Sequence, residues 1–437
     1  MKRYAEYKDS GIEWIGKIPS DWEVCKLKHI FADGENGIKI GPFGSALKGK
    51  TLSEGDYKIY NQAHLIQNDF SIDRHFVSKD TFNELISYEV HSGDILFSMM
   101  GTIGKCRIMP NGFPHGIMDS HLLKAKLNDK CLPEYFQYVY DKDNSNIVIE
   151  QLLFYSNGSI MNGLNSSIIK NVYLSFPNKE NQQKIVDYLD YKTIAIDTLI
   201  ADKQKLIDLL KEKRQAIISE AVTKGLDKTV KMKDSGIEWI GEIPAHWVIK
   251  PLFVVALENN IKNIGLRCDN LLSLSYGKII TKDIETNFGL LPESFETYQI
   301  VQEGYTILRL TDLQNDKRSL RTGYVRETGI ITSAYVGLIP TEQIDGRFLS
   351  DLLFAYDLMK IFYGLGNGVR QSMNYKDLKW LPVLAPPLAE QNQISQFIFG
   401  QTENIDRLVA DITVQIEKLK EYRQSVISEA VTGKVAI

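Results

Sequence analysis

The sequence predicts an α+β protein: two globular α/β modules separated by an antiparallel two-helix coiled coil, in a pseudo-twofold tandem repeat. Two internal repeats carry this prediction. A heptad-patterned segment at residues 193–226 returns at residues 402–435, at a constant offset of 209 (402 − 193). A tryptophan-containing segment at residues 8–22 returns at residues 233–247 with three of fifteen positions changed. Each module is therefore framed by one copy of each repeat.

The heptad-patterned segments are predicted to be long helices that pack on each other. Their apolar residues recur at alternating steps of three and four, the spacing of a coiled-coil seam. Neither helix can bury such a stripe alone, so we expect the two copies to bury each other. The predicted seam residues are Ile196, Leu199, Leu206, Leu210 and Ile217 in the first copy and Ile405, Leu408, Ile412, Leu419 and Val426 in the second. Apolar residues beside the seam widen the stripe and predict either contacts with the modules or a docking face, present twice, for a partner: Ile200, Ile207, Val409 and Ile416.

The order of the repeats predicts the direction of the helices. The second tryptophan segment follows the first helix directly, whereas the first lies at the N-terminus, far in sequence from the second helix. Joining the two ends of the chain would recreate the same order, so the second helix is expected to run back toward the first module. The helices should therefore be antiparallel, and about 40 helical residues would span roughly 60 Å.

The modules share an order of elements but not their loops. Alternating residues predict a strand at 94–101, and a helix is expected to begin at Pro133, because proline suits the first helical turn. In the second module, residues 306–312 and 333–340 are predicted strands and residues 346–363 a helix. The expected domains are residues 1–178 (tryptophan segment and first module), 179–226 (first helix), 227–386 (second tryptophan segment and second module) and 387–437 (second helix). A common scaffold with dissimilar loops is typical of modules that read different ligands.

The composition narrows the functional classes. The 437 residues are 24% charged and 43% hydrophobic, values typical of a globular protein, and no apolar run is long enough to span a membrane. The four cysteines are scattered without a CxxC pair, which predicts free thiols in a cytoplasmic protein and no metal site. The net charge of −4 argues against nucleic-acid binding by bulk electrostatics alone.

Two glycine motifs resemble catalytic loops but lack the structural context of those loops. Gly44, Gly49 and Lys50 match a phosphate-cradling loop, yet no helical apolar stripe follows them. Gly364 and Gly366 match a glycine loop for S-adenosylmethionine, but they follow a helix instead of a strand. We therefore predict no catalytic residue and no metal ligand in this chain.

Three segments carry a resemblance to a known family: GPFGSALK at residues 41–48, SGDILFSMMGTIGK at residues 92–105, and GNGVRQSMNYKDLKWLPVLAPPLAEQ at residues 366–391. Together with helices ending in RQAIISEAVT and RQSVISEAVT, they resemble the DNA-specificity subunit of type I restriction–modification enzymes. The resemblance covers essentially the whole chain. The most specific feature is the doubled order of module and helix.

The resemblance implies a non-catalytic subunit that binds double-stranded DNA. Two target-recognition domains would each read one half of a bipartite sequence. Two modification subunits, which are adenine methyltransferases, would dock on the helices, and restriction/translocase subunits would join them into an ATP-dependent nuclease. S-adenosylmethionine, ATP and Mg would be used by those partners, with no cofactor bound by this chain and no contact with a membrane. One departure is visible: Asn181 stands where the second half has Glu390.

Basic and polar residues in both modules are the candidates for DNA contact, because such side chains reach phosphates and base edges. The alternative for each is an ordinary solvated surface residue. The candidates are Lys39, Ser45, Lys48, Lys50, Arg74, Lys105, Asn157 and Asn162 in the first module and Arg309, Lys317, Arg318, Arg321, Arg370 and Gln371 in the second.

Two other functional classes stay open at this point. One is a self-contained DNA methyltransferase or nuclease with its own active site, motivated by the two glycine motifs. The other is a protein-interaction adaptor that does not bind DNA. Activity of the isolated chain would favour the first, and failure to bind DNA together with its partner would favour the second.

Overall fold

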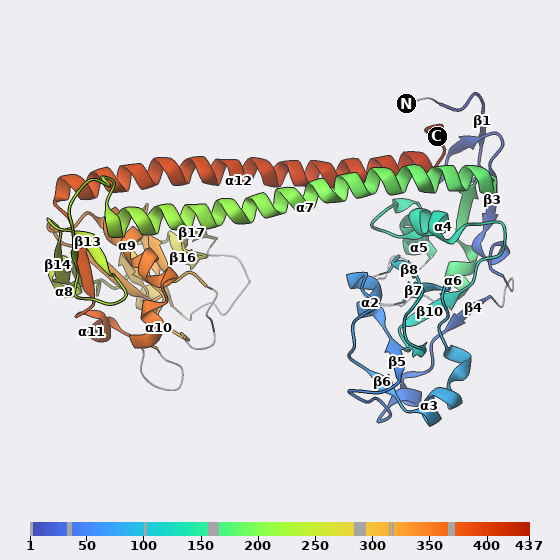
Figure 1. Cartoon of the computed structure of the whole chain (residues 1–437), viewed down its shortest axis with the longest axis horizontal. Helices are drawn as coiled ribbons and strands as arrows, with labels where there is room; N and C mark the ends of the chain where they lie inside the picture. The colour runs from blue at the N-terminus through green and yellow to red at the C-terminus, as the bar shows by residue number, and fades with distance from the viewer. Residues whose placement is uncertain are drawn as a thin grey trace. The chain divides into compact units, whose positions relative to one another are not determined.

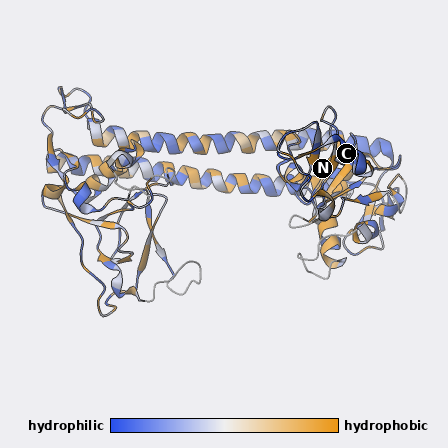
Figure 2. Cartoon of the chain, turned by 90° about the horizontal axis from the view of Figure 1, so that it is seen from below, coloured by the Kyte–Doolittle hydropathy of each residue, from blue (hydrophilic) through white to orange (hydrophobic). Residues whose placement is uncertain are grey.

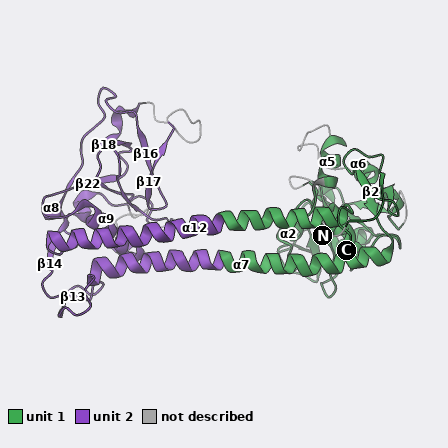
Figure 3. Cartoon of the chain, turned by 90° about the horizontal axis from the view of Figure 1, so that it is seen from above, with its two compact units in different colours: residues 1–203, 414–437 green, residues 204–413 purple. Residues whose placement is uncertain are grey.

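The computed structural model describes residues 3–32, 37–99, 103–155, 166–283, 294–313, 316, 319–365 and 372–437 (Figure 1). The chain divides into two compact units (Figure 3). Unit 1 comprises Met1–Lys203 and Val414–Ile437, and unit 2 comprises Gln204–Thr413. Two long helices, α7 (Lys179–Lys224) and α12 (Leu388–Val431), each contribute one part to unit 1 and the other part to unit 2.

Unit 1 is built from small sheets, antiparallel except for the parallel pairing of β5 with β9, with short helices between them. The hairpin β1 (Tyr7–Asp9) and β2 (Lys17–Pro19) is followed by β3 (Glu23–Lys26), which pairs with β11 (Tyr173–Phe176). A four-stranded sheet has the order β4 (Ile38–Ile40), β10 (Leu122–Ala125), β7 (Ile95–Ser98), β8 (Cys106–Ile108). A three-stranded sheet has the order β6 (Phe76–Val77), β5 (Tyr57–Tyr60), β9 (Gly116–Met118). The helices are η1 (Leu27–His29), α1 (Gly44–Leu47), α2 (Gln62–Gln67), α3 (Lys79–Glu84), η3 (Ile86–Tyr88), α4 (Pro133–Tyr140), α5 (Asn146–Tyr155) and α6 (Ser166–Asn171).

The core of unit 1 joins the four-stranded sheet, α4 and the C-terminal end of α12. Strand β7 lies within the predicted segment 94–101 and is buried at every position, as expected for a strand covered on both faces. Helix α4 begins at Pro133, as predicted. Val431 of α12 belongs to the same apolar cluster, and its carbonyl oxygen accepts a hydrogen bond from the buried Tyr135 hydroxyl at 3.3 Å. The end of α12 is therefore an integral part of the core of unit 1.

Unit 2 repeats this plan. The hairpin β12 (Met232–Asp234) and β13 (Glu242–Pro244) precedes β14 (Val248–Pro251), which pairs with β23 (Pro382–Ala385). A four-stranded sheet has the order β15 (Ala256–Glu258), β22 (Val336–Pro340), β19 (Thr306–Leu308), β20 (Thr322–Tyr324). A further sheet has the order β17 (Lys278–Lys282), β16 (Leu271–Ser275), β21 (Gly329–Ile331), β18 (Gln299–Val301). The helices are α8 (Leu252–Val255), η4 (Phe295–Thr297), α9 (Gly346–Leu358), α10 (Ile361–Leu365) and α11 (Tyr375–Leu378).

One helix expected in unit 2 is divided into two helices in the structure. The sequence predicts a single helix over residues 346–363, but α9 ends at Leu358 and α10 starts at Ile361. Between them Lys360 has a φ of 62°, in the left-handed region. A residue in that conformation ends a helix, and a lysine gives no sequence signal for it, unlike glycine.

The start of each long helix is fastened by an equivalent glutamine. Gln182 is fully buried and accepts from the backbone N–H of Leu132 at 2.8 Å, just before α4. Gln391 is also buried and accepts from the backbone N–H of Asp345 at 2.7 Å, just before α9. Since 391 − 182 is again 209, the same polar contact seats a long helix on the module in both units.

The tryptophan segments close each unit in the same way. Trp22 and Trp247 are both fully buried. Gly433, just after α12, lies so close to Trp22 that an added Cβ would be 3.2 Å from the indole, and Gly225, just after α7, has the same relation to Trp247 at 3.3 Å. Both glycines have a φ of 70–74°, which L side chains rarely adopt.

The acceptor for the indole N–H differs between the units. Trp247 Nε1 donates to Glu390 Oε1 at 3.0 Å, whereas the buried Trp22 Nε1 has no hydrogen-bond partner among the described residues. Burial raises the pKa of the neighbouring Tyr4 hydroxyl, and the Trp22 N–H opposes that shift without reaching hydrogen-bonding geometry. Unit 1 therefore has Asn181 where unit 2 has Glu390, and among the described residues its buried indole has no acceptor.

Within each unit, polar contacts join α7 to α12. In unit 1, Arg423 Nε donates to Asp197 Oδ1 at 2.9 Å and Lys203 Nζ to Gln415 Oε1 at 2.7 Å. Residue numbers rise along α7 between these contacts while they fall along α12, so the paired segments are antiparallel. In unit 2, Arg214 Nε lies 3.3 Å from Asp406 Oδ1.

The positions that α7 and α12 bury have the same spacing in both helices. Hydrophobic and hydrophilic residues alternate along each of them (Figure 2). Eight buried or half-buried positions on α7 have a buried or half-buried counterpart 209 residues away on α12: Thr193, Ile196, Ile200, Lys203, Ile207, Leu210, Arg214 and Ile217 on α7, and Thr402, Ile405, Val409, Ile412, Ile416, Leu419, Arg423 and Val426 on α12.

Three predicted seam residues are corrected by the structure. Leu199, Leu206 and Leu408 are 44%, 45% and 49% exposed, and the buried stripe passes through Ile200, Ile207 and Val409 instead. The apolar stripe is wide enough to include Leu199 with Ile200, Leu206 with Ile207 and Leu408 with Val409. The sequence pattern therefore does not show which residue of each pair faces inward. The other seven predicted residues lie among the buried or half-buried positions.

No helix among the described residues is both long and apolar enough to cross a bilayer. Within the same ranges, no group of three or more His, Cys, Asp or Glu side chains is placed to hold a metal ion.

Candidate nucleic-acid interface

An exposed polar surface forms around the α1 loop of unit 1. Gly41 makes it possible, because a Cβ there would lie 1.8 Å from the Asp119 carbonyl oxygen. The chain at 41–48 therefore packs directly against the backbone that leads into β10. Phe43, Ser45 and Lys48 are exposed on this loop, and Phe43 shows 86% of its surface.

The other candidates near this loop are held by neighbouring side chains. The Lys39 ammonium lies 4.7 Å from the centre of the Tyr88 ring, and Lys50 Nζ donates to Glu84 Oε2 at 2.5 Å. Arg74 is exposed. These contacts are at the surface, where an ion pair contributes little and a phosphate can compete for the cation.

Three polar residues beside the loop were not among the sequence candidates. Ser120 Oγ lies 3.9 Å from where a Cβ on Gly44 would stand. His121 is exposed, and its backbone carbonyl accepts from Gln62 Nε2 at 3.5 Å. No sequence motif marks Gln62, Ser120 or His121, because the segment at 119–121 reaches the α1 loop only when β10 pairs with β4, and Gln62 joins it through the His121 carbonyl.

Lys105, a candidate for DNA contact, is buried in the structure. Its side chain is 7% exposed and pairs with Asp143, and burial lowers its pKa. The neighbouring Arg107 pairs with the fully buried Asp141, which also accepts from the Cys106 backbone N–H at 3.1 Å. These pairs fasten β8 to the end of α4. The sequence showed only a basic residue next to a glycine, which does not distinguish a buried lysine from an exposed one.

Arg321 is also corrected, from DNA contact to structural support. It is fully buried, and its guanidinium donates to the backbone carbonyls of Arg309 at 3.1 Å and Thr311 at 2.8 Å. Further bonds reach the carbonyls of Asp312 and Asp316 and the Tyr363 hydroxyl. This side chain fixes the loop after β19 and has no donor left for a phosphate.

Arg309 stays accessible on that loop, 33% exposed, with its Nη2 3.6 Å from Asp316 Oδ2. Six further candidates lie outside the described residues: Asn157, Asn162, Lys317, Arg318, Arg370 and Gln371.

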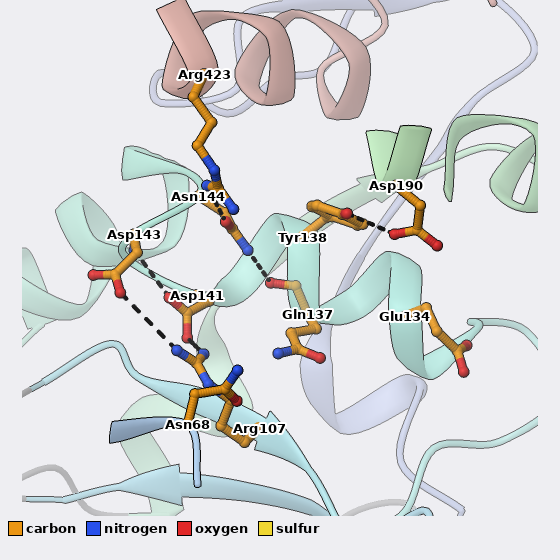
Figure 4. A pocket seen from close by; sticks show the side chains of 10 residues that line it. All are labelled: Asn68, Arg107, Glu134, Gln137, Tyr138, Asp141, Asp143, Asn144, Asp190 and Arg423. Carbon is orange, nitrogen blue, oxygen red and sulfur yellow. Dashed lines mark hydrogen bonds and ion pairs between the residues drawn. The ribbon is translucent and has the colours of Figure 1, made fainter. Parts of the chain in front are cut away.

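A cleft of about 350 Å³ in unit 1 lies between α4 and the two long helices (Figure 4). Tyr138 donates to Asp190 of α7 at 2.7 Å, and Arg423 of α12 donates to Asn144 at 3.1 Å. The lining carries four carboxylates against two arginines: Glu134, Asp141, Asp143 and Asp190 against Arg107 and Arg423. This excess of negative charge opposes a phosphate, so the cleft serves to join α4 to the helices.

The equivalent cleft of unit 2 has the opposite charge. It measures about 220 Å³ and lies between α9, β17, β20 and the long helices. Its charged lining is Arg214, Lys278, Arg326 and Arg347 against Asp351 and Asp406. Burial raises the pKa of Asp351 to about 6, against the lowering effect of Arg347 and Arg214.

Comparisons with known proteins agree on one family. The profile described as type I restriction modification DNA specificity domain matches residues 19–208. A putative type I restriction enzyme MjaX specificity subunit from Methanocaldococcus jannaschii is 25% identical over 97% of this chain and 96% of its own length. The type I restriction enzyme EcoDI specificity subunit from Escherichia coli is 20% identical over 96% and 90%.

Solved structures share the fold. A chain from a study of complex assembly and conformational transition of the type I R-M system superposes with a TM-score of 0.68 at 13% identity, covering 96% of this chain and 99% of that one. The HsdS subunit from Thermoanaerobacter tengcongensis gives 0.50 at 13% identity, over 96% and 98%.

Proposed function

Because the chain belongs to the specificity subunits of type I restriction–modification systems, we propose that its two units each read one half of a bipartite DNA target. One observation carries the proposal. The units share the tryptophan hairpin, the four-stranded sheet and the glutamine contact, but their second sheets differ, with three strands in unit 1 and four in unit 2 within the described ranges. A common frame with unlike outer sheets suits two readers of two different sequences.

In this proposal α7 and α12 form the coiled-coil spacer, and the half-sites are separated by bases that the chain does not read. Recognition in the major groove recurs about every 34–36 Å, so helix length would set the spacing between half-sites. The N-terminal target-recognition domain is proposed to end near residue 178 and the second near residue 386.

The exposed apolar residues of α7 and α12 support docking of two modification subunits, which are adenine methyltransferases, and of restriction subunits. In unit 1, Ile194 is 66% and Leu199 is 44% exposed; in unit 2, Leu206, Leu209 and Leu408 are 45–52% exposed. Apolar side chains repeated along an exposed helix face favour a protein partner. In this proposal the partners, and not this chain, use S-adenosylmethionine, ATP and Mg.

The proposal is tested on the complex with the modification subunits, by DNA binding at several salt concentrations. Replacing Lys48 and Lys50 with alanine should weaken binding and make its salt dependence shallower, because each phosphate contact contributes about −0.9 to the slope. Lys8 and Lys17, exposed on the β1–β2 hairpin, provide the matched double-alanine control. If the unmodified complex shows no sequence-dependent binding, the chain is a protein adaptor and the proposal is wrong.

A further inference from the structure

The hairpin between β16 and β17 ends in an unusual turn. Ser275 pairs with Lys278, so Tyr276 and Gly277 form a two-residue connection with φ values of 46° and 77°. Such turns favour asparagine and glycine, because both central residues need positive φ. A tyrosine at the first position is strained, since its Cβ crowds the backbone.

Packing does not explain this tyrosine. Its side chain is 85% exposed, and within the described residues its ring has no aromatic or cation partner. Gly277, in contrast, is held: a Cβ there would lie 3.1 Å from Leu320 Cβ and 3.5 Å from Phe354. The turn is therefore fixed in place while the tyrosine is presented to solvent. Strain kept at an exposed aromatic residue points to binding.

The positively charged cleft of unit 2 lies beside this turn, and Lys278, the residue after Gly277, lines it. Lys278 Nζ lies 3.0 Å from Asp406 Oδ2, and Arg214 Nε lies 3.3 Å from the other oxygen of the same carboxylate. Arg347 Nε is 3.7 Å from Asp351 Oδ2. Two carboxylates thus serve three cations, and the exposed Arg326 has no ion pair in the part of the chain that the structure describes.

The cleft also holds arginine donors that are only loosely paired. The Nε atoms of Arg214 and Arg347 are buried and lie 3.3 Å from Asp406 Oδ1 and 3.7 Å from Asp351 Oδ2, but among the described residues neither contact has hydrogen-bond geometry, and Asp351 Oδ2 lacks a hydrogen-bond partner as well. Buried polar groups in native proteins are normally hydrogen-bonded, so the hydrogen-bonding capacity of these arginines is not fully used. A phosphate offers several acceptor oxygens and matches the arginine fork.

We infer that the β16–β17 turn and the cleft beside it form a DNA contact: Arg326 and Lys278 hold a backbone phosphate at the cleft, and the Tyr276 ring packs on an adjacent base. This rests on the proposed function and adds a named site to it. Leu320, against which the turn packs, precedes Arg321, which fixes the loop that carries Arg309. The site therefore adjoins the loop that carries Arg309, a candidate for DNA contact. An aromatic side chain beside a positive groove is a common way to hold a nucleotide, and stacking contributes about 1–3 kcal/mol per base.

The test uses the whole complex with modification subunits and its mapped DNA target. Tyr276→Asn should weaken binding about tenfold, within the range expected for one stacked base. The same variant should raise the unfolding temperature, because asparagine suits the turn. Tyr276→Phe should bind like the unmodified protein. Arg326→Ala should weaken binding and reduce the salt slope by about one phosphate. Lys282→Ala, an exposed lysine at the other end of β17, is the charge-matched control.

The outcomes separate this inference from the proposed function. If the unmodified complex does not bind its target, the proposed function fails. If it binds, and both Tyr276→Asn and Arg326→Ala bind equally well, only this inference is wrong. If these variants bind DNA normally but lose a modification subunit, the β16–β17 turn and its cleft are a protein-docking site and the inference is overturned.

Discussion

Replacing Glu390 with alanine should destabilise unit 2, because the buried Trp247 indole would lose its acceptor. Trp247 Nε1 donates to Glu390 Oε1 at 3.0 Å, and Glu390 Oε2 lies 2.7 Å from His246 Nε2. A buried donor left unpaired costs about 1–3 kcal/mol. The His246 side chain is 44% exposed, so that contact adds at most about 1 kcal/mol. The expected loss is therefore about 2–3 kcal/mol, whereas Glu390→Gln keeps an acceptor oxygen and should lose about 1 kcal/mol.

Unit 1 offers the reverse experiment. Trp22 is equally buried and its indole lacks an acceptor in the part of the chain that the structure describes, while Asn181 occupies the position of Glu390. Asn181→Glu should stabilise unit 1 by about 1 kcal/mol. Asn181→Asp adds the same charge at the start of the helix but is one methylene shorter, so it controls for attraction to the helix N-terminus.

Hydrogen exchange followed by mass spectrometry can assay the two units separately through the β1–β2 and β12–β13 hairpins. The expected result is faster exchange in β12–β13 for Glu390→Ala and slower exchange in β1–β2 for Asn181→Glu. Equal effects of alanine and glutamine at 390, or of aspartate and glutamate at 181, would refute the argument from the indole acceptor.

Three further predictions concern stability. The pKa of Asp351 is raised from 3.8 to about 6. The folded state therefore holds this proton more tightly, and stability is lost as pH rises from about 4 through 6. Asp351→Asn should stabilise unit 2 at pH 8, by up to about 3 kcal/mol, and hardly at pH 4; denaturant unfolding at both values tests this, and an equal gain at both would contradict it. Arg321→Ala should destabilise unit 2 by about 3–5 kcal/mol, measured by the same unfolding, because several carbonyls lose their donor; a folded variant impaired only in DNA binding would restore the original assignment. Ile207→Ala should cost about 2–4 kcal/mol and Leu206→Ala less than about 1 kcal/mol, and the reverse order would show that the buried stripe is wrongly placed.

Much of the frame was predictable because it rests on local or repeated signals. Proline at 133 marks a helix start, and the strand at 95–98 lies in an apolar-rich segment between two glycines. The offset of 209 also links equivalent buried positions in the two long helices. These features depend on neighbours in sequence or on one repeated pattern.

The failures depend on contacts between distant segments. Whether Leu199 or Ile200 faces inward is decided by what packs on the helix, and not by the stripe itself. Arg321 has the composition of a DNA contact, but the loop after β19 wraps around its guanidinium. Tyr276 gave no signal, because its significance lies in a φ of 46° and in the cleft beside it.

The most direct test of two independent readers is to map methylated adenines in cells carrying the system, before and after residues 227–386 are replaced by the corresponding domain of a relative. The expected result is a bipartite motif in which the exchange alters one half-site and leaves the other half and the spacer unchanged. A contiguous motif, or a change in both halves, would contradict the account.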